Sequence, residues 1–117
     1  MKDFRQLKVW GKAHATVLQT YRLLHELPAD ERFALAAQMR RAAVSIPSNI
    51  AEGCGRDSER DFSRFLKIAA GSASELEYQV LLAKDLGYIG VDAQADLDMR
   101  LNEVKRMLNS LIQKLDA

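Results

Sequence analysis

Apolar residues recur along four long stretches of the chain at alternating steps of three and four, the spacing of an amphipathic helix. The first stretch carries Leu7, Trp10, His14 or Ala13, Val17, Tyr21 and Leu24. The third carries Phe62, Leu66, Ala69, Ala73, Leu76, Val80 and Ala83, and the fourth carries Leu97, Leu101, Val104, Leu108, Leu111 and Leu115. The last two sets are heptad seams, in which one face of a helix packs along another helix.

Breaking and capping residues divide this pattern into four predicted helices. They span about 3–26, 29–53, 57 or 58 to 86, and 92 to nearly the end of the chain. Pro28 ends the first, because the residue before a proline disfavours the α conformation. Asp92 is the expected N-cap of the fourth. We therefore expect a single domain over residues 1–117, an all-α, up-down-up-down four-helix bundle.

Pro47 lies inside the second predicted helix. A proline there removes a backbone donor and crowds the carbonyl one turn back, at a cost of about 3 kcal/mol. The apolar periodicity continues through Pro47, which favours one kinked helix. The alternative is a true break, with Ser45 capping a new short helix. Gly53 and Gly55 are expected to end the helix, since glycine adopts the left-handed conformation without strain.

Two features predict contacts beyond a simple core. Small residues surround Gly71 in the third predicted helix, so we expect another helix to approach its backbone closely there. Further apolar residues lie beside the main seams: Leu18, Val44, Phe65, Ile68, Tyr78 and Leu82. They indicate either wide core faces or a second apolar surface used for self-association.

The composition is that of an ordinary soluble protein, with 48% hydrophobic and 28% charged residues. Seventeen basic residues oppose sixteen acidic ones, which argues against a strongly basic nucleic-acid binder but allows a local basic patch. No stretch reaches the roughly 18 apolar residues of a membrane helix, and no signal peptide is evident. With the single cysteine, Cys54, this predicts a cytoplasmic protein in a reducing compartment.

Residues with catalytic or metal-ligand spacing are missing from the sequence. The only histidines, His14 and His25, are far apart, and Cys54 has no histidine near it in the sequence. Neither a zinc site nor an activated nucleophile follows from such spacing. We therefore expect a protein that is not an enzyme and has no catalytic residues, metal, cofactor or small-molecule substrate.

The remaining candidate chemistry is basic. Four residues step by four, four and three along the third predicted helix: Arg56, Arg60, Arg64 and Lys67. If Arg56 continues that helix, they form a stripe that could follow phosphates. The alternative is a solvated helix face balanced by Glu59 and Asp61.

Arg40 and Arg41 complete the set of basic candidates. If the second and third helices pair antiparallel, Arg41 lies within a turn of Glu75, and an ion pair between them is plausible. Arg40 is then the better candidate for a ligand, and Arg41 for a structural contact.

Several motifs resemble the four-helix-bundle proteins called 23S rRNA-intervening-sequence proteins. They are Phe4-x-x-Leu7-x-Val9-Trp10-x-Lys12-Ala13, Gln38-x-Arg40-Arg41-Ala42-Ala43-Val44-Ser45-Ile46-Pro47-Ser48-Asn49-Ile50-Ala51-Glu52-Gly53, Phe62-x-x-Phe65-Leu66-x-x-Ala69-x-Gly71-Ser72-x-x-Glu75-Leu76-Glu77 and Leu86-Gly87-Tyr88. The resemblance covers essentially the full chain, although Cys54 stands where an aromatic residue is common. It implies a bacterial origin, a four-helix protomer and a barrel-shaped homopentamer.

The resemblance also brings a relative, the accessory variability determinant of diversity-generating retroelements, a basic pentamer that binds nucleic acid and a reverse transcriptase. No activity is established for the intervening-sequence proteins themselves. We expect an oligomer that binds structured RNA or a nucleic-acid-handling protein through repeated copies of Arg40, Arg41 and their basic neighbours. The alternative is a protein scaffold in which the same motif is purely structural.

Overall fold

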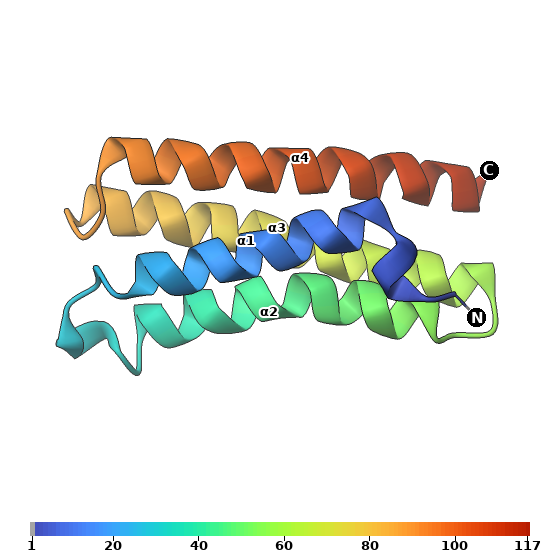
Figure 1. Ribbon diagram of the computed structural model, residues 1–117, viewed down its shortest axis with the longest axis horizontal. Helices are drawn as coiled ribbons and strands as arrows, with labels where there is room; N and C mark the ends of the chain where they lie inside the picture. Colours follow the sequence, from blue (N-terminus) through green and yellow to red (C-terminus); the bar gives the residue numbers. More distant parts are fainter. Residues whose placement is uncertain (1) are drawn as a thin grey trace.

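The computed structural model describes residues 2–117, which form four long helices and two short 3-10 helices and contain no strand. The elements are η1 (Phe4–Gln6), α1 (Lys8–Leu24), η2 (Ala29–Glu31), α2 (Leu35–Cys54), α3 (Glu59–Asp85) and α4 (Val91–Asp116). Figure 1 shows the four long helices side by side, with consecutive helices joined at alternate ends of the molecule. The predicted all-α class with four helices is confirmed.

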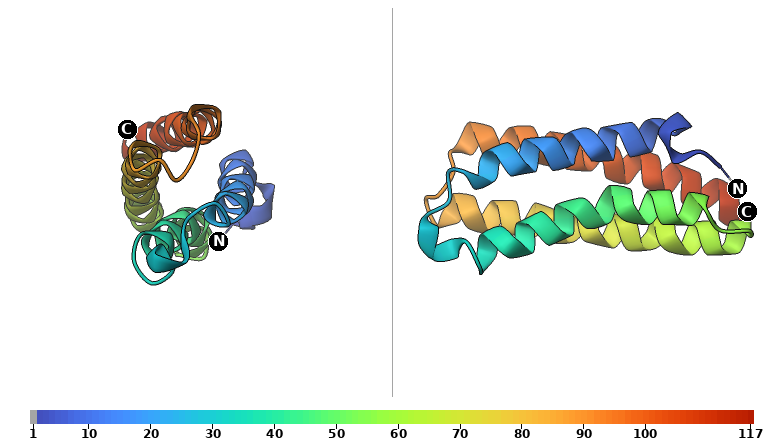
Figure 2. Two further views of the ribbon diagram at one scale, coloured as in Figure 1. Left: turned by 90° about the vertical axis from the view of Figure 1, so that its left-hand side faces the viewer. Right: turned by 60° about the horizontal axis from the view of Figure 1, so that its bottom comes forward.

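Each long helix packs on two neighbours, so the four helices enclose one core. Viewed end-on, α2 lies between α1 and α3, and α4 closes the ring between α3 and α1 (Figure 2). The predicted seam of α3 is buried along its whole length. The seam of α4 is buried as far as Leu108, whereas Leu111 and Leu115 are partly exposed. The heptad pattern therefore identified the faces that meet in the core.

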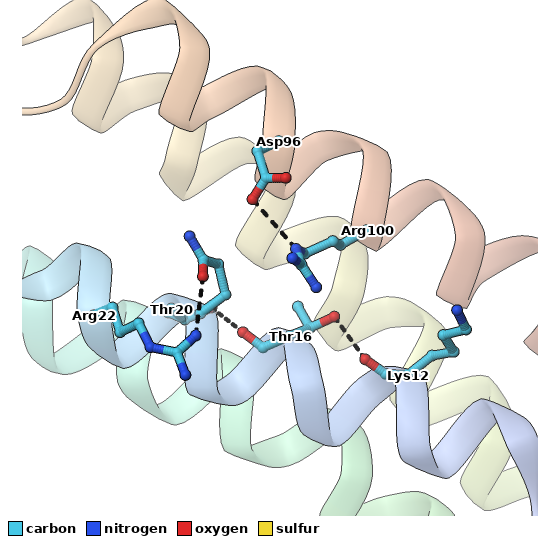
Figure 3. Close-up of polar contacts among 7 residues, drawn as sticks. Lys12, Thr16, Thr20, Arg22, Asp96 and Arg100 are labelled. Carbon is cyan, nitrogen blue, oxygen red and sulfur yellow. Dashed lines mark hydrogen bonds and ion pairs between the residues drawn. The ribbon is translucent and has the colours of Figure 1, made fainter.

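Threonines occupy two fully buried positions on α1 and satisfy their hydroxyls within the helix. Thr16 donates to the Lys12 carbonyl at 2.8 Å, and Thr20 donates to the Thr16 carbonyl at 2.7 Å (Figure 3). A buried hydroxyl without a partner would be destabilising, and this back-bonding removes that cost. Beside them, Arg100 of α4 is held by Asp96 at 3.2 Å. The polar side chains named here, on α1 and α4, therefore have their partners within their own helices.

The first helix begins later than expected. Asp3 caps η1 by accepting a hydrogen bond from the Arg5 amide at 3.0 Å, and Leu7 is extended. The α-helix runs only from Lys8 to Leu24. The predicted start at about residue 3 is therefore the start of a single 3-10 turn and not of the α-helix.

The start of the second helix, predicted at about residue 29, was wrong: α2 begins at Leu35. Asp30 and Glu31, which suit the first turn of a helix, lie in η2. The non-helical backbone of Ala34 (φ −116°, ψ −106°) separates η2 from α2. Glu31 then accepts a hydrogen bond from the Leu35 amide at 3.2 Å, so a side chain from the preceding turn caps α2.

The N-cap of α3 is one of the residues that the sequence offered, whereas the N-cap of α4 is not. The sequence left Asp57 and Ser58 open as the start of α3, and Ser58 caps it, because its Oγ accepts from the Asp61 amide at 3.1 Å. The predicted N-cap of the fourth helix was wrong: Gly90 occupies that position, and Asp92 lies in the first turn of α4. A carboxylate there still suits the positive end of the helix dipole.

Pro47 lies in the interior of α2, which continues through it without a break, so the prediction of one helix is confirmed. The alternative break at Ser45 was wrong. Ser45 shares a hydrogen bond with the Ser72 hydroxyl of α3 at 2.8 Å and accepts another from Asn49 at 2.9 Å. These polar contacts join α2 to α3 beside the proline. A bend at Pro47 stays a prediction.

The close approach of α2 and α3 lies at Gly53, and not at Gly71. A Cβ on Gly53 would lie 2.9 Å from both Phe62 Cδ1 and Phe65 Cβ, whereas a Cβ on Gly71 would have nothing within 4 Å. The expected approach at Gly71 was therefore wrong within the protomer. The expected left-handed end of α2 was also wrong: Gly53 is helical, and Gly87 is the only residue within 2–117 with positive φ.

Candidate nucleic-acid interface

Two of the four predicted stripe residues flank the ring of Phe65. Arg56 lies in the turn between α2 and α3, so the condition for a single helical stripe of all four residues is not met. Its guanidinium nevertheless lies 4.8 Å from the Phe65 ring centroid, and that of Arg64 lies 4.5 Å from it. The ring is buried beneath them. The fold thus brings Arg56 beside α3, through an aromatic ring to which both cations are attracted.

Both of these arginines also contact carboxylates. Arg56 pairs with Glu52 at 3.7 Å, and Arg64 pairs with Asp61 at 3.6 Å. All four side chains are exposed, and such surface pairs contribute about 0–1 kcal/mol. A phosphate could therefore replace either carboxylate at small cost.

Lys67 is the most firmly held member of the stripe. It pairs with Asp116 of α4 at 2.9 Å, and the Ser63 hydroxyl donates to the same carboxyl group at 2.7 Å. These two hydrogen bonds, from Lys67 first and then Ser63, lower the pKa of Asp116. Lys67 therefore links the start of α3 to the end of α4. Such a link leaves it less available to a ligand than the arginines.

Arg60 is exposed and forms no ion pair in the described part of the chain. It opens onto a shallow cleft of about 660 Å³ between α3 and the end of α4. Three of the six charged lining residues are acidic and three are basic: Glu59, Arg60, Asp61, Arg64, Lys67 and Asp116. The stripe is thus a surface of mixed charge, in which Arg60 is the cation without a paired carboxylate.

Arg41 lies in a different groove, between α2 and α3. It is exposed and shares this groove with Gln38, Ser45, Ser72 and Glu75. The predicted proximity of Arg41 and Glu75 therefore agrees with the fold. The two side chains do not form an ion pair within residues 2–117.

Arg40 lines a third cleft, which we call the Tyr21 cleft. It has a volume of about 330 Å³ and lies where α1 ends and α2 begins. Its lining residues are Tyr21, Leu24, His25, Leu27, Pro28, Ala29, Arg32, Ala36 and Arg40. Sequence reasoning placed Tyr21 on the core stripe of the first helix and gave Arg32 no role. The predicted site residues therefore fall in three separate places rather than one patch.

The single cysteine, Cys54, lies in surroundings that do not favour reactivity. Cys54 is buried, and burial raises the pKa of its thiol, so the reactive thiolate is disfavoured at neutral pH. Within the described residues, no group of three or more His, Cys, Asp or Glu side chains could hold a metal ion. The same part of the chain has no helix long and apolar enough to cross a membrane.

Comparison with known proteins supports the resemblance seen in the motifs. The family model of the 23S rRNA-intervening sequence protein matches residues 5–110. A crystal structure from Bacteroides thetaiotaomicron VPI-5482, described as a protein with unknown function from the S23 ribosomal protein family, is 28% identical with a TM-score of 0.83. The match covers 89% of this chain and 97% of that one. No curated protein matches the chain. The chain belongs to the 23S rRNA-intervening sequence protein family.

Proposed function

We propose that this protein is a non-enzymatic homopentamer that binds structured RNA, or a nucleic-acid-handling partner, through rings of basic residues. The observation that carries the proposal is that Arg40, Arg41 and Arg60 form no ion pair within the described residues. Eight of the seventeen basic residues pair with carboxylates, and these three are the predicted site residues that do not. Unpaired arginines suit phosphate, because the planar guanidinium donates two parallel hydrogen bonds to it.

Exposed apolar residues support self-association. Of the six apolar residues beside the seams, Phe65 is buried and Leu82 is partly buried, which agrees with wide core faces. The other four are exposed in the protomer: Leu18, Val44, Ile68 and Tyr78. The open surface at Gly71 would let a helix of another subunit approach α3 closely. A bend at Pro47 would curve α2 around such a ring.

A ring also explains how a protomer of net charge +1 could bind nucleic acid. Five copies of Arg40, Arg41 and Arg60 would contact one polyanion together, so weak single contacts combine into useful avidity. The resemblance to the accessory variability determinant suggests the same arrangement, although that relative is strongly basic. We further propose a bacterial origin, which the family resemblance implies, and a cytoplasmic location, which the single cysteine favours.

Light-scattering mass, measured with the ratio of absorbance at the nucleic-acid and protein maxima, tests both parts of this proposal on purified protein. The proposal predicts five times the protomer mass and co-purifying nucleic acid that is removed by high salt. A monomer would refute the ring. A pentamer free of nucleic acid that retains no added RNA at low salt would refute the binding.

The second candidate is a protein scaffold in which the Arg40–Gly53 motif stabilises the fold and binds no nucleic acid. The observation in its favour is the contact between Ser45 and Ser72, which uses motif residues to join α2 to α3. It predicts that changing Arg40 and Arg41 to alanine dissociates or unfolds the protein. The leading proposal predicts instead that these variants keep their mass and lose RNA.

A further inference from the structure

The Tyr21 cleft has the charge of an anion site. Its lining includes Arg32 and Arg40, together with His25, and it includes no carboxylate. Neither arginine forms an ion pair within residues 2–117. This distinguishes the cleft from the α3–α4 cleft, where three of the six charged lining residues are acidic. Electrostatics therefore favours an anionic ligand in the Tyr21 cleft.

The rest of the lining is apolar and includes an aromatic ring. Leu24, Leu27 and Ala36 form part of the wall, and the side chain of Tyr21 remains 43% exposed. The volume of about 330 Å³ is within the range of small-ligand sites, about 300–1,000 Å³. A phosphate alone would use the arginines and leave this wall in water. The lining fits a ligand that joins a phosphate to a flat, apolar ring.

We propose that the Tyr21 cleft binds one unpaired nucleotide of a single-stranded RNA, with the base against Tyr21 and the phosphate between Arg32 and Arg40. This inference rests on the proposed function and deepens it, because it specifies that the protein binds unpaired nucleotides of the RNA. In a duplex the bases are already stacked and paired, so a side chain reaches a base face only in loops, bulges and ends. Stacking on an aromatic side chain tolerates any base, which predicts weak sequence preference.

Glu31 is the positioning residue for this cleft. One carboxylate oxygen accepts from the Leu35 amide at 3.2 Å, and the other accepts from the Tyr88 hydroxyl at 2.8 Å. The 25–34 connection is therefore tied both to α2 and to the turn before α4. Because Arg32 directly follows Glu31, these two hydrogen bonds fix the backbone that carries one of the two phosphate-binding groups.

The test compares binding of a short unstructured RNA and a hairpin RNA of equal length by the purified protein. Tyr21→Leu removes the ring, and Tyr21→Phe, the matched control, keeps it. We expect Tyr21→Leu to weaken single-strand binding by about 5- to 150-fold, the loss of one stacked base. We expect Tyr21→Phe to stay within about twofold of wild type, a difference well below one stacked base.

The arginines give an independent readout. Arg32→Ala and Arg40→Ala should each reduce the slope of log affinity against log salt for the unstructured RNA by about 0.7. Tyr21→Leu should leave that slope unchanged, because a stacked base releases no counterions. A free nucleoside monophosphate should compete only weakly, since it lacks the neighbouring phosphates of a strand.

The outcomes separate this inference from the proposed function. Equal losses for Tyr21→Leu and Tyr21→Phe, or no loss for either, would overturn the nucleotide site, and hairpin binding would still uphold the proposed function. A monophosphate that competes as well as the strand would assign the cleft to a free nucleotide and overturn the inference. A wild-type protein that binds neither RNA at low salt would overturn both.

Discussion

Arg40 and Arg41 are adjacent in the chain but open onto opposite flanks of α2. Arg40 shares the Tyr21 cleft with residues of α1, whereas Arg41 shares its groove with Glu75 of α3. One residue turns an α-helix by about 100°, which is enough to place consecutive side chains over different neighbours. The arginine pair of the motif is therefore two separate features, and they should respond differently to substitution.

Arg41→Ala should change the free energy of unfolding by less than about 1 kcal/mol. Arg41 is exposed and has no ion pair within residues 2–117, and exposed groups of this kind contribute little to stability. Urea unfolding at fixed protein concentration measures the effect. A loss of more than about 2 kcal/mol would show that Arg41 is structural in the protomer, as one would expect of a buried pair.

Gly53→Ala should destabilise the protein by about 1–3 kcal/mol, because the new methyl group would overlap the side chains of Phe62 and Phe65. Gly71→Ala is the matched control in α3. Its Cβ would meet nothing within 4 Å, and alanine favours a helix interior by about 1 kcal/mol.

Thermal unfolding of the two glycine variants should therefore shift in opposite directions. If Gly71 lies at a subunit contact, the Gly71→Ala variant should also show a lower light-scattering mass. Equal destabilisation by both substitutions would contradict the account of where α2 and α3 approach each other.

Glu31→Ala should lower the free energy of unfolding by about 1–2 kcal/mol through loss of the α2 cap. It also removes the acceptor of the Tyr88 hydroxyl. Tyr88→Phe removes only that second contact, so its effect should be the smaller of the two. Denaturant midpoints compare the variants. A larger loss for Tyr88→Phe would indicate that Glu31 does not cap α2 in solution.

Tyr88 also offers a spectroscopic check on the same contact. Its hydrogen bond to Glu31 is the main reason why the pKa of the Tyr88 hydroxyl is raised. Alkaline titration followed by tyrosinate absorbance should therefore show one tyrosine that ionises later than the others. In Glu31→Ala this late step should move toward the ordinary pKa. A late step that is unchanged in that variant would contradict the assignment.

Asp98→Asn should stabilise the protein at neutral pH. Burial first, and the charge of Glu77 second, raise the pKa of Asp98 above its ordinary 3.8. The folded state then holds the Asp98 proton more tightly than the unfolded state, so wild-type stability falls as pH rises through 3.8 and up to the folded pKa. Asparagine removes this loss and still accepts from Gln94.

The stability advantage of Asp98→Asn should therefore grow from low pH to neutral pH and stay constant above. Denaturant midpoints measured across this range report it. An advantage that is independent of pH would refute the role of the raised pKa.

Local pattern was sufficient for most of the fold. The heptad seams of α3 and α4 depend only on residue spacing, and the Ser58 cap depends on a side chain three residues from its donor. The start of α2 depends on the non-helical backbone of Ala34. No residue type near this position predicts that conformation. Gly53 and Gly71 looked alike because the sequence does not say which helix face meets a neighbour.

The candidate site was less predictable, because its surroundings come from distant residues. Lys67 is paired by Asp116 at the far end of the chain, and no spacing rule joins them. Tyr21 shares an apolar stripe with Val17 and Leu24, yet it is exposed, since the chain turns away after α1 and leaves a cleft. The one available signal was the Pro28 break, which brings Arg32 and Arg40 around the end of α1.

RNA binding measured as a function of salt is the most direct test of whether the unpaired arginines bind nucleic acid. The account predicts that log affinity of the wild-type protein falls linearly with log salt. Arg40→Ala should lower that slope and keep the wild-type mass, whereas Arg56→Ala, which removes a cation already paired with Glu52, should change it less. Binding that does not depend on salt, or a slope unchanged by Arg40→Ala, would contradict the account.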